Sequence, residues 1–213
     1  MSLTDSISEY YTAERPELLG FVLPHGPFTS VLDIGCAGGL LGASLLKSGI
    51  AARCDGIEPN SQAACLAAQQ LQHVWHGGLE AVADQVPWEE YDLIAMADVL
   101  EHLVDPWSAL RDLHARTQPS VRLLLSVPNV RHYKISLPLL LRGDFRYVDH
   151  GIMDRTHLHF FTRDSLIETL NECGWQAEVV GSHMKSRYRR WYMPTHLIEP
   201  FVAVQYMVLG RKR

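Results

Sequence analysis

Glu101 and four histidines are the residues of this chain best suited to proton transfer. Glu101 and His102 are adjacent and follow an apolar stretch. His157 and His159 alternate, so they would share one face of an extended segment, and His132 is the fourth histidine. A neutral imidazole can remove a proton from an attacking hydroxyl, which contributes about 10²–10⁴-fold to a rate. We therefore take Glu101, His102 and His157 as the candidate catalytic residues.

Structural roles stay open for the same positions. Glu101 and His102 can equally tie the loop around them to backbone amides, as many buried polar groups do. One of the two alternating histidines is expected to orient its loop. Asp154 and Arg155 can equally form an ion pair with each other and have no further role.

A second chemical feature is a glycine-rich turn that follows Asp33. The run 31–41 reads as a buried strand, a tight turn and the start of a helix. Asp33 ends the strand, where open α/β sheets place their ligands. The dinucleotide fingerprint Gly-x-Gly-x-x-Gly fails, because Ala37 and Leu40 occupy two of its glycine positions. No Gly-Lys-Ser or Gly-Lys-Thr follows, so the phosphate-loop pattern fails as well.

Glu58 stands 25 residues after Asp33, at the end of the next predicted strand. An ionised carboxylate has two acceptor oxygens and can accept hydrogen bonds from both hydroxyls of a ribose. Spacing alone leaves a solvated strand-end acid equally plausible. Together with the glycine turn, the ribose role is favoured.

The motifs resemble a known family. Asp33-x-Gly35-x-x-x-Gly39 resembles motif I of the class I S-adenosylmethionine-dependent methyltransferases, and the phrase 98–103 resembles the motif IV region of their small-molecule members. The resemblance continues through 126–133 and 151–163. The nearest groups are methyltransferases of glycan and cell-surface pathways, with ubiquinone-type and methionine-pathway relatives.

The resemblance implies S-adenosyl-L-methionine as the cofactor. In the family an aspartate after the third strand binds the adenine amine, and Gly78 stands there in this chain. Backbone groups and stacking on Leu79 would then hold the adenine. The expected cofactor-binding residues are Asp33, Gly35, Cys36, Gly39, Glu58, Pro59, Gly78, Leu79, Ala97 and Asp98.

The implied activity is transfer of a methyl group to an oxygen, or less favourably a nitrogen, of a small-molecule or carbohydrate-type acceptor. One alternative is a metal-assisted enzyme, because Asp98-x-x-Glu101-His102 with the distant His157 resembles the metal set of small-RNA 2′-O-methyltransferases. We assign no metal ligand. A non-catalytic scaffold that binds S-adenosylmethionine is a second alternative, favoured by Gly78. An NAD-dependent enzyme is disfavoured by Ala37 and Leu40.

Strand and helix signals alternate along the chain, which is typical of a mostly parallel α/β sheet. The resemblance implies a doubly wound, Rossmann-like sheet of seven strands, with an antiparallel last strand and helices on both faces. We predict one methyltransferase domain over 1–213, with N-terminal helices in 1–28 and substrate-lid insertions at 130–160 and 183–200. Expected strands are 30–34, 51–57, 73–75, 92–97, 121–127, 175–180 and 202–209; expected helices are 9–23, 40–48, 60–71, 105–116 and 162–173.

Composition excludes several classes. The formal net charge of −5 over 213 residues argues against a general nucleic-acid surface. No apolar run approaches the roughly 20 residues that span a bilayer, and the first residues lack a signal-peptide pattern. The four cysteines form no Cys-x-x-Cys pair, so we expect a cytoplasmic protein. The basic, aromatic segment 185–192 is either an acceptor clamp, a partner surface or a solvated face near a homo-oligomer contact.

Overall fold

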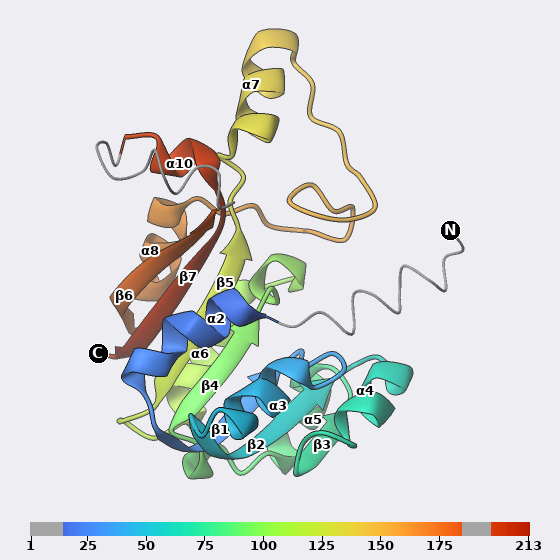
Figure 1. The fold of residues 1–213 in the computed structure, drawn as a ribbon, viewed down its shortest axis with the longest axis vertical. Helices are drawn as coiled ribbons and strands as arrows, with labels where there is room; N and C mark the ends of the chain where they lie inside the picture. Colours follow the sequence, from blue (N-terminus) through green and yellow to red (C-terminus); the bar gives the residue numbers. More distant parts are fainter. Residues whose placement is uncertain (1–14, 185–196) are drawn as a thin grey trace. The chain divides into compact units, whose positions relative to one another are not determined.

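A computed structural model describes residues 15–184 and 197–213 of the chain (Figure 1). Its seven strands hydrogen-bond in the order β3-β2-β1-β4-β5-β7-β6. The sheet is mostly parallel with antiparallel last strands and has helices around it, which confirms the predicted fold class. Contacts group the described residues into two compact units, which we describe separately. The prediction of one domain over 1–213 stays a prediction.

Unit 1 holds the described residues up to Ala97, together with Arg116–Leu124 and Lys212. Its strands β1, β2 and β4 run parallel, with Asp33 of β1 opposite Gly56 of β2 and Ala95 of β4. The strands are β1 (Phe28–Ile34), β2 (Ala51–Glu58), β3 (His73–His76) and β4 (Leu93–Ala97). The helices are α2 (Pro16–Val22), η1 (Leu23–His25), α3 (Leu40–Lys47), α4 (Ser61–Ala67), α5 (Leu79–Val82), η2 (Ala83–Gln85) and η3 (Trp88–Glu90).

Local signals explain the ends of the unit 1 helices. Pro16 opens α2, where a missing N–H costs nothing. Asn60 caps α4 by accepting the amides of Gln62 and Ala63 at 3.0 Å each. The helix ends at Ala67, four residues before the predicted Leu71. The short helix α5 was not predicted, because its four residues are too few to show a periodicity.

Unit 2 holds Asp98–Ala115, Leu125–Arg211 where described, and Arg213. Its core includes Leu110, Leu166, Leu170 and Trp175, whose indole donates to the carbonyl of Leu110 at 2.9 Å. The elements of this part of the chain are η4 (Leu100–His102), α6 (Pro106–Arg116), β5 (Arg122–Pro128), α7 (Tyr133–Arg142), α8 (Arg163–Glu172), β6 (Trp175–Met184), α10 (Glu199–Val202) and β7 (Ala203–Lys212).

Local signals also explain the ends of α8 in unit 2. Thr162 caps α8 in a capping box with Ser165, and Gly174 with a φ of 84° follows its end. The basic segment 185–192, most of the predicted lid 183–200 and residues 1–14 lie outside the described residues. Within the described part of the chain, no helix is long and apolar enough to cross a membrane.

Candidate functional site

The glycine-rich turn after β1 uses its own amides internally. Gly35 and Cys36 donate to the carbonyl of Ile57 at 2.8 and 3.1 Å, and Ala37 donates to a carboxylate oxygen of Glu58 at 2.8 Å. A phosphate cradle needs backbone N–H groups that point at the ligand. These three amides are engaged elsewhere, which agrees with the failed dinucleotide fingerprint.

The backbone of the turn is left-handed at three positions. Gly35, Ala37 and Gly39 have φ values of 70°, 49° and 80°. A residue with a Cβ rarely adopts a positive φ, so Ala37 stands in a conformation that glycine fills more easily. The cost of alanine here is therefore conformational.

Asp33 is a buried carboxyl group at the end of β1. It is 2% exposed, and its Oδ2 has no hydrogen-bond partner among the described residues. Burial raises its pKa to about 7; Arg15 opposes the shift and the Glu58 carboxylate adds to it. A buried carboxyl in this state fits a cationic ligand group, which would favour its ionised form. The amino group of S-adenosylmethionine has this property.

Glu58, also buried, organises the turn with both oxygens. Oε2 accepts from Ala37 and Oε1 accepts from the amide of Asn60, each at 2.8 Å. Each carboxylate oxygen has a second lone pair. Glu58 therefore keeps acceptor capacity for ribose hydroxyls while it holds the turn.

The other expected cofactor residues of unit 1 differ in their surroundings: some border open space or solvent, and one side chain is buried. Gly78 precedes α5, and a Cβ built on it would meet nothing within 4 Å, so there is open space where the family has a side chain. Leu79 begins α5 and Pro59 is exposed. The Cys36 sulfur instead lies 2.5 Å from the position of a Cβ on Gly56. Its side chain therefore packs against β2, and its thiol also lies 3.9 Å from the carbonyl oxygen of Ala37 in the turn.

Asp98 follows Ala97, the last residue of β4, and adopts a left-handed φ of 57°. Its Oδ1 accepts hydrogen bonds from the Ser126 hydroxyl at 3.0 Å and from the Gln205 amide. Aspartate tolerates this conformation better than most residues. Two side chains of unit 2, to which Asp98 itself belongs, thus hold the Asp98 carboxylate in place.

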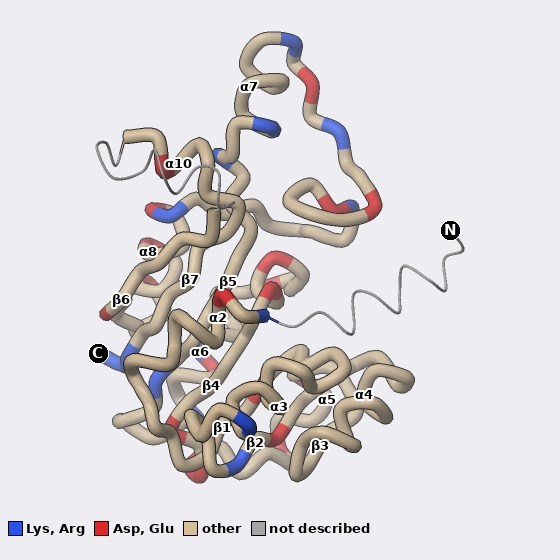
Figure 2. Tube along the Cα trace, in the orientation of Figure 1, with Lys and Arg blue, Asp and Glu red and all other residues tan. Residues whose placement is uncertain are grey.

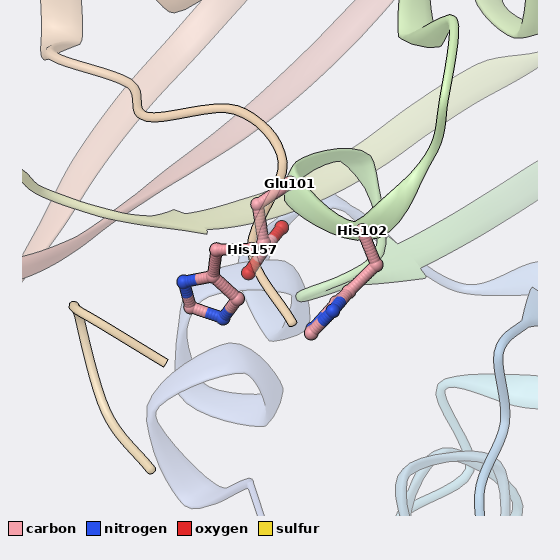
Figure 3. Close-up of side chains that lie close together, drawn as sticks. All are labelled: Glu101, His102 and His157. Atoms are coloured by element: carbon pink, nitrogen blue, oxygen red, sulfur yellow. The ribbon is translucent and has the colours of Figure 1, made fainter. Parts of the chain in front are cut away.

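Glu101, His102 and His157 converge in unit 2 (Figure 3). One ligand atom from each residue lies within 4.8 Å of the others. The two imidazole rings meet edge to face, with centroids 4.7 Å apart. Glu101 is 1% exposed and His157 8% exposed. The three residues predicted to act together therefore do lie together, although Asp98 is outside this cluster.

The backbone of Glu101 joins the two chain segments. Its carbonyl accepts from the amide of Leu158 at 2.7 Å and from that of His159 at 3.1 Å. These bonds hold the segment after α7 against η4. The backbone of Glu101 therefore ties this loop, while the structural alternative for the side chains of Glu101 and His102 stays a prediction.

Hydrogen bonds at the two Nδ1 atoms define the tautomers of the histidines. His157 Nδ1 lies 3.1 Å from the carbonyl oxygen of Ile152, which only accepts, so Nδ1 carries the proton. His102 Nδ1 lies 3.2 Å from the Thr156 hydroxyl, whose own proton goes to Asp154 at 2.6 Å. His102 therefore also donates through Nδ1. In the neutral form, each ring carries its lone pair on Nε2, where a proton or a cation could bind.

Burial lowers the pKa of His102, and the neighbouring His157 lowers it further. The hydrogen bond that His102 donates to Thr156 and the charge of Asp154 act in the opposite direction. The net shift keeps the imidazole neutral at neutral pH. A neutral imidazole is the form that a general base requires.

The remaining predictions for this region are corrected. His159 does not share a face with His157, because its ring packs on Trp107 with centroids 5.4 Å apart. His132 is the N-cap of α7. Arg155 pairs with Asp149 at 2.8 Å and leaves Asp154 to Thr156, so the predicted Asp154–Arg155 pair is wrong.

Sequence reasoning missed the Asp154–Thr156 pair that orients His102. Asp154 Oδ1 accepts both the amide of Thr156 at 2.8 Å and its hydroxyl. An aspartate that binds the backbone two residues later is a common local turn. The signal Asp-x-Thr was therefore present next to His157, but its contact with His102 comes from the fold.

A family model described as "Methyltransferase domain" matches residues 7–180. The chain belongs to this methyltransferase family. A ubiquinone biosynthesis O-methyltransferase of Pseudomonas entomophila is 32% identical over 84% of this chain and 76% of its own length. The enzyme of the same name from Aeromonas salmonicida is 32% identical over 62% of this chain and 56% of its own length.

The fold of the methyltransferase also matches solved structures. A SAM-dependent methyltransferase from Archaeoglobus fulgidus superposes with a TM-score of 0.71 at 16% identity, covering 99% of this chain and all of the other. As a member of this family, the methyltransferase uses S-adenosylmethionine as its methyl donor. Both the family and the cofactor inferred from the motifs are confirmed.

Proposed function

We propose that this methyltransferase methylates an oxygen of a small-molecule acceptor, with His102 or His157 as the general base. The supporting observation is the convergence of two imidazoles, each with its Nδ1 engaged in a hydrogen bond, beside the buried Glu101. The relatives are named as O-methyltransferases of ubiquinone biosynthesis, which favours oxygen over nitrogen as the acceptor atom.

The chain's own residues would carry three tasks. Asp33 and Glu58 would bind the cationic and ribose parts of S-adenosylmethionine, which supplies an electrophilic methyl group. An acceptor hydroxyl would donate a hydrogen bond to an imidazole Nε2, and its proton would move to that nitrogen as the oxygen attacks. Asp154, through Thr156, would stabilise the imidazolium formed at His102.

An aromatic cluster beside His157 supports an acceptor with an apolar or aromatic part. Phe160 lies 6.4 Å from the His157 ring and packs on Phe145 and Tyr147 with centroids 5.6 and 6.0 Å away. Phe145 and Tyr147 are 39% and 48% exposed. Half-exposed aromatic rings bind planar apolar groups well. The region 130–160 would thus contribute to acceptor binding, which is the role that the sequence predicts for it as a lid. The screen below also includes sugars, because a carbohydrate-type acceptor is the alternative.

The test is a turnover screen over catechols and other phenols, sugars and short RNAs. Either His102→Gln or His157→Gln, whichever removes the base, should lower kcat by about 10²–10⁴-fold, with S-adenosylhomocysteine affinity unchanged. His159→Gln is the matched control, because His159 packs on Trp107 outside the cluster. Full turnover in both cluster variants would refute the base assignment.

A metal-assisted reaction is the second candidate. Two imidazole nitrogens and one carboxylate form a ligand set suited to a divalent transition metal. Such an ion would be held by Glu101, His102 and His157 and would polarise the acceptor oxygen, with an RNA ribose hydroxyl as one possible acceptor. Titration calorimetry with Mn²⁺ and Zn²⁺ decides between the candidates. Binding that Glu101→Gln abolishes, with activity lost to a chelator, supports the metal; unchanged activity in chelator removes it.

A further inference from the structure

The helix α7 and the loop after it expose large apolar side chains. Leu140 and Leu141 are 79% and 74% exposed, and α7 buries none of its residues. A helix of a globular protein normally buries one apolar stripe against a core. The exposed set in 131–148, which we term the α7 surface, includes Leu137, Leu139, Leu140, Leu141, Phe145 and Tyr147.

The α7 surface is also basic within an acidic chain. Residues 131–148 contain four cations and one acid, whereas the whole chain has a net charge of −5. Figure 2 shows the blue positions along α7 and the loop. The single acid, Asp144, pairs with Arg146 at 2.9 Å, and Arg146 is still 85% exposed. The cations are Arg131, Lys134, Arg142 and Arg146.

We propose that the α7 surface binds to the face of an anionic lipid bilayer. Leucines at positions 137, 140 and 141 share one helical face and would insert between acyl chains, while the cations contact lipid phosphates. Tyrosine and phenylalanine are suited to the level of the headgroups. With ten residues α7 is too short to span the bilayer, which takes about 20. It would lie on the surface.

Ring contacts connect the α7 surface to the histidine cluster. Tyr147 and Phe145 pack on Phe160, and Phe160 packs on His157. An apolar molecule dissolved in the bilayer would thus meet a continuous apolar path toward His157. The inference goes beyond the proposed function and does not depend on it, because lipid binding is measured without turnover.

Sedimentation of the full chain with vesicles tests the proposal. One vesicle population is phosphatidylcholine alone, and the other contains about one third phosphatidylglycerol. We expect binding to the anionic vesicles that weakens as salt screens the charges. Leu140→Glu with Leu141→Glu should lower the partition coefficient at least about tenfold. The matched control places the same charges at two other exposed apolar residues, Leu66→Glu with Val104→Glu, and should bind like the unchanged chain.

Variants that remove the cations of the α7 surface test the electrostatic part of the binding. Lys134→Gln with Arg142→Gln should abolish the preference for anionic vesicles, and S-adenosylhomocysteine binding checks that every variant is folded. No binding to anionic vesicles, or an equal loss in the control variant, overturns the proposal. Sedimentation velocity without lipid is the last arm. A dimer that the Leu140/Leu141 variant dissociates would overturn it too, because a second copy then covers α7.

Discussion

The carboxyl group of Asp33 connects cofactor binding to pH. Because it is buried and its pKa is raised to about 7, it holds a proton below neutrality in the empty protein. A ligand ammonium group would interact with the ionised form only. Binding would then release a proton below pH 7, and by linkage the affinity must change with pH.

We therefore predict that S-adenosylhomocysteine affinity rises with pH up to neutrality. It should increase by up to about tenfold per pH unit below the pKa and become flat above pH 8. Asp33→Asn should weaken binding and remove this dependence. Titration calorimetry from pH 5.5 to 8.5 measures both, with Glu80→Gln as an exposed control. An affinity of the unchanged chain that is independent of pH would contradict the role of Asp33.

Individual residues show where sequence reasoning reaches its limit. Asp33, Glu58 and the turn were predictable because short-range spacing sets them at strand ends. Glu101 and His157 are 56 residues apart, and their contact could be inferred only from the family resemblance. Physically it depends on the Glu101 carbonyl, which binds two amides after His157. Local pattern also misplaced His159, because the segment is not an extended strand there.

At the scale of elements, the turn between β1 and α3 requires glycine for two separate reasons. Gly39 has a φ of 80°, and a Cβ on it would lie 3.0 Å from the Cα of Ala67 in α4. Gly49, after α3, has a similar φ of 71° but nothing within 4 Å of such a Cβ. A comparison of Gly39 with Gly49 therefore distinguishes the cost of a left-handed backbone from the cost of a steric conflict between α3 and α4.

We predict that Gly39→Ala destabilises the protein more than Gly49→Ala. Gly49→Ala should cost about 1 kcal/mol from its left-handed backbone alone. Gly39→Ala should cost about 2–3 kcal/mol, because the steric conflict with α4 adds to the strain. Urea unfolding measures both variants. Equal costs would mean that the α3–α4 approach relaxes freely and that the packing argument is wrong.

Elements with strong periodicity or caps were predictable, and short ones were not. The strands β1, β2 and β4 and the helices α3, α6 and α8 follow their predicted positions within two residues. The helices α5 and α10, four residues each, were not anticipated. The sequence predicts a lid insertion at 130–160, but it alone could not show that the leucines of α7 stay exposed. Exposure depends on which neighbours the fold provides.

At the scale of the whole molecule, ligand binding should appear as added stability. A ligand at about 100 times its Kd stabilises the folded state by about 2.7 kcal/mol. For a chain of 213 residues this corresponds to a rise in Tm of about 5–10 °C. We predict this rise with S-adenosylhomocysteine, and we expect Glu58→Ala to lose most of it at the same concentration.

Amide hydrogen exchange locates the source of that stability. Asp33, Gly35 and Glu58, which we propose bind the cofactor, belong to unit 1, while the histidine cluster belongs to unit 2. The ligand should therefore slow exchange in 33–39 and 58–62 in the unchanged chain, and much less in Glu58→Ala. A Tm shift of equal size in both chains, or protection absent from these two segments, would mean that the ligand is held elsewhere. Protection that extends beyond the expected cofactor residue Asp98 to 99–102 would show that binding also stabilises η4.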